Sequence, residues 1–144
     1  MRRFAVWFFV CAAFAVPLIA ADVLTPADVE KVAAVSGVHS VARGSAAGAG
    51  GDLNFTGPDG KLLAMVVVDP GKFDSLKRTF FLSDAKGVGD EAFFAPKGAT
   101  LPYAIYFRKG SRVASLSTYF DRQGKPKLSA EQLLALARIL ASRL

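Results

Sequence analysis

The sequence predicts an α+β domain in which a single antiparallel sheet of about five strands packs against N- and C-terminal helices. Three observations predict this class. Capped helical segments begin near residues 25 and 129, apolar runs of strand length lie between them, and short turn sequences separate these runs. Strands joined by short turns pair as antiparallel neighbours, so the expected order is α-β-β-α-β-β-β-α. The 144 residues, 52% of them hydrophobic and 21% charged, fit one small globular domain.

The first 20 residues have the pattern of a secretory signal peptide. Arg2 and Arg3 precede an apolar run over residues 4–16, Pro17 ends the run, and Ala20 supplies a small residue for cleavage. We therefore expect a signal peptide over 1–20 and a single domain over 21–144, located in the periplasm or secreted. The alternative is an uncleaved N-terminal membrane anchor, for which about 20 apolar residues are needed. Export would separate the chain from nucleic acid, so no nucleic-acid partner is expected.

Cysteine content and net charge narrow the chemistry. The only cysteine, Cys11, lies inside the apolar run and too early for lipidation, so the mature chain would have no disulfide and no thiol chemistry. The net charge of +6 becomes +4 once Arg2 and Arg3 are removed. This mildly basic balance permits weak contact with anionic membrane or cell-wall polymers.

Local signals place the first helix and the segment after it. Thr25 suits the N-cap, Pro26 the first helical position, and Gly37 the end of the helix. His39 is expected in a polar linker. The small residues of 43–51 predict a flexible loop, because they offer too little apolar surface to bury.

The middle of the chain predicts a hairpin and a short helix. Strands over 53–56 and 61–69 flank the turn sequence Gly-Pro-Asp-Gly at 57–60. The second strand is apolar on both faces, which favours a central strand covered on most of both sides. A short helix over 73–78 should turn Phe73, Leu76 and Phe80 inward.

The second half predicts a loop over 83–90, strands over 91–95, 101–108 and 112–120, and a terminal helix. Tyr103, Ile105 and Phe107 should share one face of the middle strand. Ser129 with Gln132 three residues later forms a capping-box pattern at the start of the helix.

The central motif is Gly-Val-Gly-Asp-Glu-Ala at residues 87–92. It formally matches the dinucleotide fingerprint, but a strand rather than a helix follows it, so no nucleotide or other cofactor is expected. We interpret Gly87 and Gly89 as the hinge of a turn and expect Asp90 to bind backbone N–H groups. Glu91 should pair with a nearby base.

A small hydrolase or metal-dependent enzyme using Asp90, Glu91 and His39 is the alternative interpretation of this motif. Adjacent residues of an extended segment point to opposite faces, so Asp90 and Glu91 should not converge on one atom. His39 is the only histidine, no Gly-x-Ser-x-Gly sequence is present, and one histidine without cysteine makes a structural zinc site improbable. We therefore assign no catalytic residue and no metal ligand.

Two basic clusters flank the last predicted strand. Arg108, Lys109 and Arg112 lie at its first turn, and Arg122, Lys125 and Lys127 follow its other end. Such clusters are usually solvated turns. The sharper hypothesis is that Arg108, Lys109 and Arg112 form an anion- or membrane-binding tip, which makes them candidate binding residues together with Asp90 and Glu91.

The motif at 87–93, the sequence Phe-Arg-Lys-Gly at 107–110 and the Leu-Ala-rich terminal helix also carry a resemblance. The chain resembles small secreted bacterial domains of unknown function, many of them lipoproteins and some with a PsbP-like α/β sandwich. It departs from them by lacking a lipidation cysteine. The resemblance implies fold and location and no catalytic residues. We expect an exported, non-enzymatic envelope domain that binds an envelope protein or another ligand.

Overall fold

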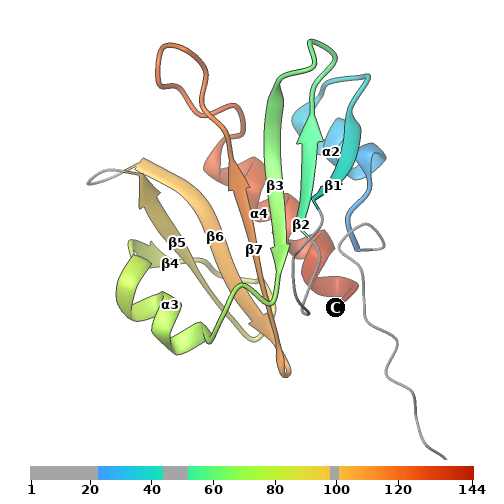
Figure 1. Cartoon of the computed structure of the whole chain (residues 1–144). Coiled ribbons are helices and arrows are strands. Elements are labelled where there is room, and N and C mark those ends of the chain that lie inside the picture. The colour runs from blue at the N-terminus through green and yellow to red at the C-terminus, as the bar shows by residue number, and fades with distance from the viewer. Residues whose placement is uncertain (1–22, 44–51, 98–100) are drawn as a thin grey trace, which may run out of the picture.

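The computed structural model describes residues 23–43, 52–97 and 101–144 (Figure 1). The predicted signal peptide over 1–20 and residues 44–51 of the predicted loop lie outside the described residues. In the described ranges the chain forms one seven-stranded antiparallel sheet with three helices, which confirms an α+β fold built on a single sheet. None of these helices combines the length and apolar character needed to cross a membrane.

The strands lie in the order β1-β2-β3-β7-β6-β5-β4, and every neighbouring pair is antiparallel. Two meanders, β1-β2-β3 and β4-β5-β6-β7, are joined where β3 pairs with β7. The elements in chain order are α2 (Pro26–Ala33), β1 (His39–Arg43), β2 (Asp52–Thr56), β3 (Leu62–Val68), α3 (Phe73–Phe80), β4 (Ser83–Asp84), β5 (Glu91–Lys97), β6 (Leu101–Lys109), β7 (Arg112–Thr118) and α4 (Ala130–Ser142).

The prediction of about five strands was wrong because both edge strands were missed. Residues 39–42 of β1 are all exposed, with Val41 at 56%, so β1 shows no alternation of buried and exposed residues. Backbone pairing with β2 alone defines it. His39 consequently begins a strand instead of lying in a linker. At the other edge, β4 has only two residues and lies within the segment predicted as a loop.

The predicted N-cap at Thr25 of α2 and the predicted capping box at Ser129 of α4 are both present, and Thr25 also forms a capping box, with Asp28. The end of α2 differs from the prediction. The helix ends at Ala33, and Ala34 adopts a left-handed conformation (φ 55°) three residues before Gly37. The Glu30 carboxylate then accepts the N–H groups of Gly37 at 2.7 Å and Val38 at 2.9 Å, which directs the chain toward β1.

Apolar side chains form two clusters on opposite faces of the sheet. The larger one lies between the sheet and the helices α2 and α4, and includes Phe55, Ile105, Phe107 and Leu116. The smaller one lies beneath α3 and consists of Phe73, Phe93, Ala95 and Ala104. The adjacent phenylalanines of the central motif divide between them: Phe93 is fully buried in the smaller cluster, while Phe94 packs against the larger one.

Helix α3 covers only part of its face of the sheet, because it packs mainly on β5 and β6 (Figure 1). The inner position of β3 agrees with prediction, but one of its faces is less covered than expected. Leu63, Ala64, Val66 and Val68 are buried in the larger cluster, whereas Met65 and Val67 are only half-buried. Phe80 was also expected to point inward; its side chain is 39% exposed and stacks on Tyr106 with ring centroids 6.0 Å apart.

Candidate functional site

Strand β7 has two chemically different ends. At its first end, the central motif meets the β6–β7 turn. Gly87 and Gly89 have positive φ values of 76° and 57°, and a Cβ atom at Gly89 would overlap the Arg108 carbonyl oxygen. Residue 89 must therefore be glycine for two reasons, conformation and space. Arg138 of α4 holds the same segment by donating to the carbonyl oxygens of Gly87 at 3.2 Å and Lys86 at 3.3 Å.

Asp90 binds the backbone of the neighbouring turn, as expected. The Gly110 N–H donates to Asp90 Oδ2 at 2.7 Å, and the Asp90 N–H donates to the Arg108 carbonyl oxygen at 2.8 Å. Lys109 Nζ lies 3.8 Å from Asp90 Oδ1. The carboxylate thus connects β5 to the β6–β7 turn.

Glu91 turns instead toward α3. Lys77 Nζ donates to Glu91 Oε1 at 2.7 Å, and Arg108 Nη2 lies 2.8 Å from Glu91 Oε2. The hydrogen bond from Lys77 and the charges of both bases hold the pKa of Glu91 below its usual range. The carboxylates of Asp90 and Glu91 thus bind different partners on different elements.

The three cations of the predicted anion-binding tip all have carboxylate partners. Arg112 pairs with Asp69 at 3.1 Å, Arg108 with Glu91, and Lys109 with Asp90. Lys77 and Asp84 complete a cluster of four cations and four carboxylates, which we call the paired end of β7: Asp69, Lys77, Asp84, Asp90, Glu91, Arg108, Lys109 and Arg112. An anion binding there would have to compete with these carboxylates.

His39 is far from the paired end. It lies on β1 at one edge of the sheet, and β5 is five strand spacings away, a separation on the order of 24 Å. The three residues of the enzymatic alternative, Asp90, Glu91 and His39, therefore do not lie together in one site. Within the described ranges, no three His, Cys, Asp or Glu side chains gather in a metal-binding arrangement either.

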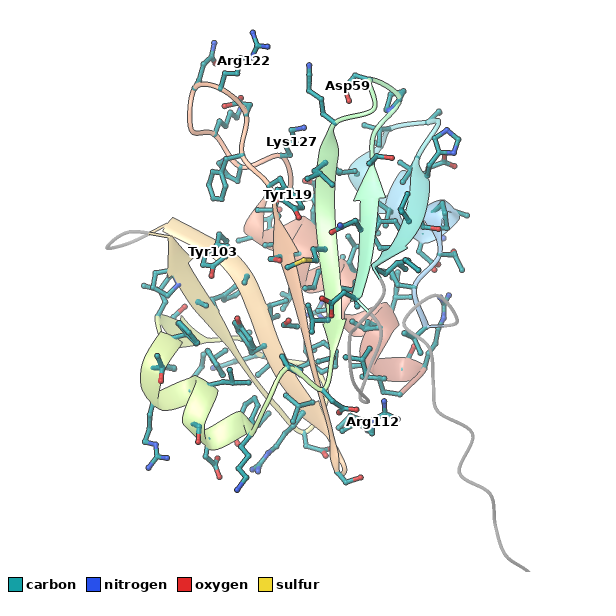
Figure 2. All side chains as sticks on the ribbon, viewed as in Figure 1. Asp59, Tyr103, Arg112, Tyr119, Arg122 and Lys127 are labelled. Atoms are coloured by element: carbon teal, nitrogen blue, oxygen red, sulfur yellow. The ribbon has the colours of Figure 1, made fainter. Side chains whose placement is uncertain are left out.

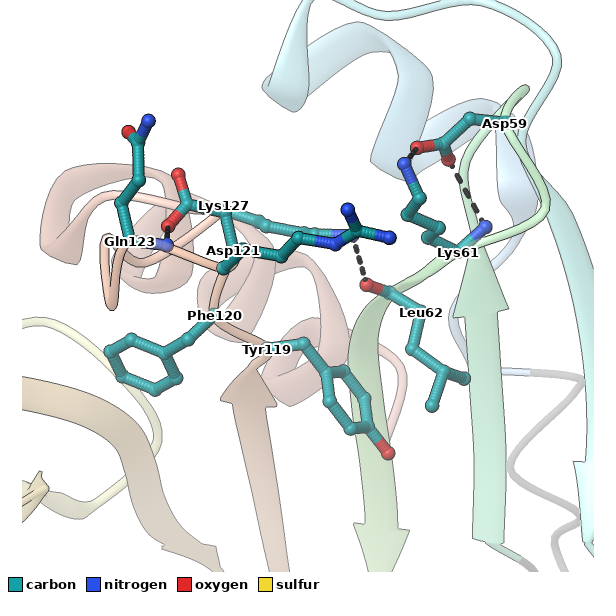
Figure 3. A pocket seen from close by; sticks show the side chains of 9 residues that line it. Asp59, Lys61, Leu62, Tyr119, Phe120, Asp121, Gln123 and Lys127 are labelled. Atoms are coloured by element: carbon teal, nitrogen blue, oxygen red, sulfur yellow. Dashed lines mark hydrogen bonds and ion pairs between the residues drawn. The ribbon is translucent and has the colours of Figure 1, made fainter.

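At its second end, β7 runs into two adjoining hollows, which we call together the β7 groove. The first has a volume of about 620 Å³ and is lined by Asp59, Lys61, Leu62, Tyr119, Phe120, Asp121, Arg122, Gln123 and Lys127 (Figure 3). The second has a volume of about 730 Å³ and is lined by Met65, Pro96, Tyr103, Ser117, Thr118, Tyr119, Phe120 and Asp121. The two hollows share Tyr119, Phe120 and Asp121.

The loop over residues 119–128 is held by its own hydrogen bonds and by β3. Asp121 Oδ1 accepts the N–H groups of Gln123 and Lys125, both at 2.9 Å. The Lys127 N–H donates to the Tyr119 carbonyl oxygen at 2.9 Å, and its ammonium donates to the Leu62 carbonyl oxygen at 2.8 Å. The wall of the groove is therefore a structured turn.

The charges of the groove differ from those of the paired end. The backbone N–H and the ammonium of Lys61 bind Asp59 at 3.0 and 3.1 Å, and these contacts lower the pKa of Asp59. Arg122, Lys125 and Lys127 have no carboxylate within ion-pair distance in the part of the chain that the structure describes. Cations therefore predominate among the groups left open to a ligand.

Aromatic side chains form the other wall of the groove. The Tyr119 hydroxyl donates to Asn54 Oδ1 at 3.3 Å, which gives the buried amide of Asn54 a partner and fixes the ring over β3. Tyr103 lines the second hollow instead of joining Ile105 and Phe107 in the larger core, which corrects the predicted grouping. Tyr103, Tyr119, Arg122 and Lys127 lie at one end of the sheet, and Arg112 lies at the other (Figure 2).

The β7 groove was not predicted from the sequence. Tyr103 was placed on one face with Ile105 and Phe107, and Arg122 and Lys127 were interpreted as part of a solvated turn. The available signal was the order of the residues: Ser117 and Tyr119 alternate with the buried Leu116 and Thr118 and lead directly into a basic loop. Comparisons with protein-family models, with curated proteins and with solved structures found no match.

Proposed function

We propose that the chain is an exported, non-enzymatic envelope domain that binds a ligand or partner in the β7 groove. One observation carries this proposal: the groove joins half-buried aromatic side chains to cations that have no carboxylate partner in the described ranges. Concave sites with apolar walls and a few polar groups are the usual form of ligand sites, and both hollows have volumes typical of such sites.

Export is the part of the proposal that depends on sequence alone. Basic, apolar and small residues follow one another over 1–20 in the order of a signal peptide. The resemblance to small secreted bacterial domains supports the same location, and we include a PsbP-like sandwich in the proposal. Fractionation of expressing bacteria tests export: the chain should accumulate outside the cytoplasm and be shortened by about 20 residues. An unshortened chain retained in the membrane fraction would instead support the anchored form.

The second candidate, an anion- or membrane-binding tip at Arg108, Lys109 and Arg112, has weaker support. Each of these cations already pairs with a carboxylate, and Arg108 also lies over the Phe73 ring at 5.3 Å. A ligand at this tip would have to break ion pairs and displace a packed guanidinium. We therefore place the ligand at the other end of β7.

A fragment screen followed by amide NMR tests the location of the site. Bound fragments should shift the backbone signals of residues 65, 103 and 117–121, and Tyr103→Ala should remove the binding. Phe80→Ala is the matched control, because Phe80 is an aromatic residue open to solvent that lies on α3, away from the groove. Fragments that shift residues 87–94 or 108–112 instead would contradict the proposal.

Hydrolysis assays test the claim that the domain is not an enzyme. The purified chain should not cleave ester, peptide or phosphate substrates, since Asp90 and Glu91 diverge and His39 is remote. Turnover that disappears in Asp90→Ala would overturn the claim and restore the enzymatic alternative.

A further inference from the structure

We infer that the ligand of the β7 groove is a small amphiphilic organic anion. Its apolar body would lie against Met65, Pro96 and Tyr103 in the second hollow, and its anionic group would face Arg122 and Lys127 in the first. This inference rests on the proposed function and specifies the chemistry of the ligand.

The polarity of the groove changes along its length. The hollow nearest β6 is lined mainly by a thioether, a proline ring and aromatic rings, and its other polar groups are the Ser117 and Thr118 hydroxyls and, where it joins the first hollow, the Asp121 carboxylate. The hollow nearest the β2–β3 turn is lined mainly by charged and amide side chains. Tyr119, Phe120 and Asp121 belong to both, so one molecule spanning them would meet mainly apolar and aromatic side chains at one end and the cations Arg122 and Lys127 at the other.

The charged hollow favours an anion because its carboxylates are already bound. Asp59 accepts the backbone N–H of Lys61 and pairs with its ammonium (Figure 3), and Asp121 accepts two backbone N–H groups of its own loop. Neither carboxylate lies within ion-pair distance of Arg122 or Lys127. A ligand anion would therefore gain charge-assisted hydrogen bonds from these two cations without displacing a protein carboxylate.

Other ligand classes fit less of the groove. A neutral apolar ligand would cover Arg122 and Lys127 without pairing them, which carries a desolvation cost. A cation would be repelled by the same side chains, and an inorganic anion would leave the aromatic hollow unused. A planar guanidinium at residue 122 suits a carboxylate, sulfonate or phosphate group, which it can bind through two parallel hydrogen bonds.

Two dyes that share one ring system test the inference on the full chain as recovered from expressing cells. Anilinonaphthalene sulfonate carries an anionic group, and phenylnaphthylamine is its neutral counterpart. In low salt, fluorescence titration should show that the sulfonate binds about tenfold more tightly, as expected for a charge-assisted hydrogen bond. Added salt should reduce this advantage, because screening weakens interactions of exposed charges.

Variants then separate the two hollows. Arg122→Gln should weaken binding of the sulfonate about three- to fivefold, within the range for an exposed charge pair, and leave the neutral dye unchanged. Lys127→Gln provides a second, independent removal of charge. Tyr103→Ala should weaken the binding of both dyes. Arg78→Gln is the matched control, since Arg78 is an exposed arginine on α3, and it should change neither titration.

The outcomes distinguish this inference from the proposed function. If Tyr103→Ala weakens both dyes equally while charge and salt have no effect, the groove binds ligands but the anionic class is wrong. If neither dye responds to Tyr103→Ala, the inference fails, and the fragment screen judges the proposed function independently. Sedimentation with phosphatidylglycerol vesicles that the sulfonate dye does not compete away would also overturn the inference, in favour of a membrane surface as the partner.

Discussion

The two ends of β7 carry similar basic clusters but differ in the partners that surround them. At the paired end, four cations face four carboxylates. At the groove, the carboxylates bind within their own turns and leave Arg122 and Lys127 without a carboxylate partner among the described residues. A cluster of charge in a sequence therefore says little about binding until its partners are known.

The two ends of β7 differ in how far along the chain the partners of their charged residues lie. Lys77 comes from α3 and Asp69 from the end of β3, and they reach residues that are 14 and 43 positions away along the chain. The groove carboxylates find partners only two to four residues away. The paired end thus joins separate elements, whereas the groove turns are held locally and their cations are the ones to which we assign ligand binding.

The largest expected effect is on stability at the paired end and comes from Gly89→Ala. The new methyl group would overlap the Arg108 carbonyl oxygen in a left-handed backbone conformation, so we expect a loss of about 3 kcal/mol or more in the free energy of unfolding. Gly124→Ala in the groove loop is the matched control. Gly124 also has positive φ (79°) but has open space around it, so the cost should be about 1 kcal/mol. Equal losses in urea denaturation would contradict this difference.

The second largest loss of stability should come from breaking the ion pair between Asp28 of α2 and Arg143 at the end of α4. Asp28 is more buried than the carboxylates of the paired end, so this pair is the standard against which those pairs can be compared. Arg143 Nη2 donates to Asp28 Oδ1 at 3.0 Å, and its hydrogen bonds lower the pKa of Asp28 to about 2. Asp28→Asn should therefore cost about 2 kcal/mol at neutral pH, the free energy that corresponds to this shift.

The pH dependence of this reference pair has a defined sign. Because the folded-state pKa of Asp28 is lowered, the ion pair stabilises the protein fully above pH 3.8, and this contribution is lost as the pH falls toward 2. The difference in unfolding free energy between wild type and Asp28→Asn should close over that interval. If the difference in unfolding free energy stayed constant with pH, the ion pair between Asp28 and Arg143 would not be the cause of the lost stability.

A smaller effect is expected from Glu91→Gln at the paired end. The Glu91 side chain is 33% exposed, against 16% for Asp28, so its ion pairs with Lys77 and Arg108 are screened more by solvent and should stabilise the fold less than Asp28 does. Its lowered pKa means that this stabilisation is present above pH 4.5 and lost as the pH falls through the folded-state value. Thermal unfolding should show a lower Tm for the variant at neutral pH and equal values in acid. If the variant were as stable as wild type at neutral pH, these ion pairs would not contribute to the stability of the fold.

The smallest effect on stability should come from Arg122→Gln at the groove. Arg122 is exposed and has no carboxylate partner in the described ranges, so its replacement should change the unfolding free energy by no more than about 0.5 kcal/mol. The same variant should weaken binding of the sulfonate dye. Loss of stability comparable to that of Glu91→Gln would show that the two ends of β7 are alike after all.

The elements that could be predicted from the sequence are those with local signals. The capping boxes at Thr25 and Ser129 involve residues three positions apart, and the turns at 57–60 and 110 depend on a few neighbouring residues. The turn-binding role of Asp90 followed from the preference of aspartate for backbone N–H groups near glycines. Short-range interactions of this kind are encoded in contiguous residues.

The edge strands and the groove depend on positions far apart in the chain. β1 has no apolar alternation, so only its pairing with β2 reveals it. The β7 groove combines the β2–β3 turn, Pro96 near the end of β5, Tyr103 near the start of β6 and the loop after β7. These segments meet because β3 pairs with β7, and the hollows are open because α3 covers only the part of this face over β5 and β6. By itself the sequence determined the helices, the hairpins and the central turn through local interactions; tertiary structure alone decided which charges are paired and which line a groove, because pairing depends on contacts across the sheet.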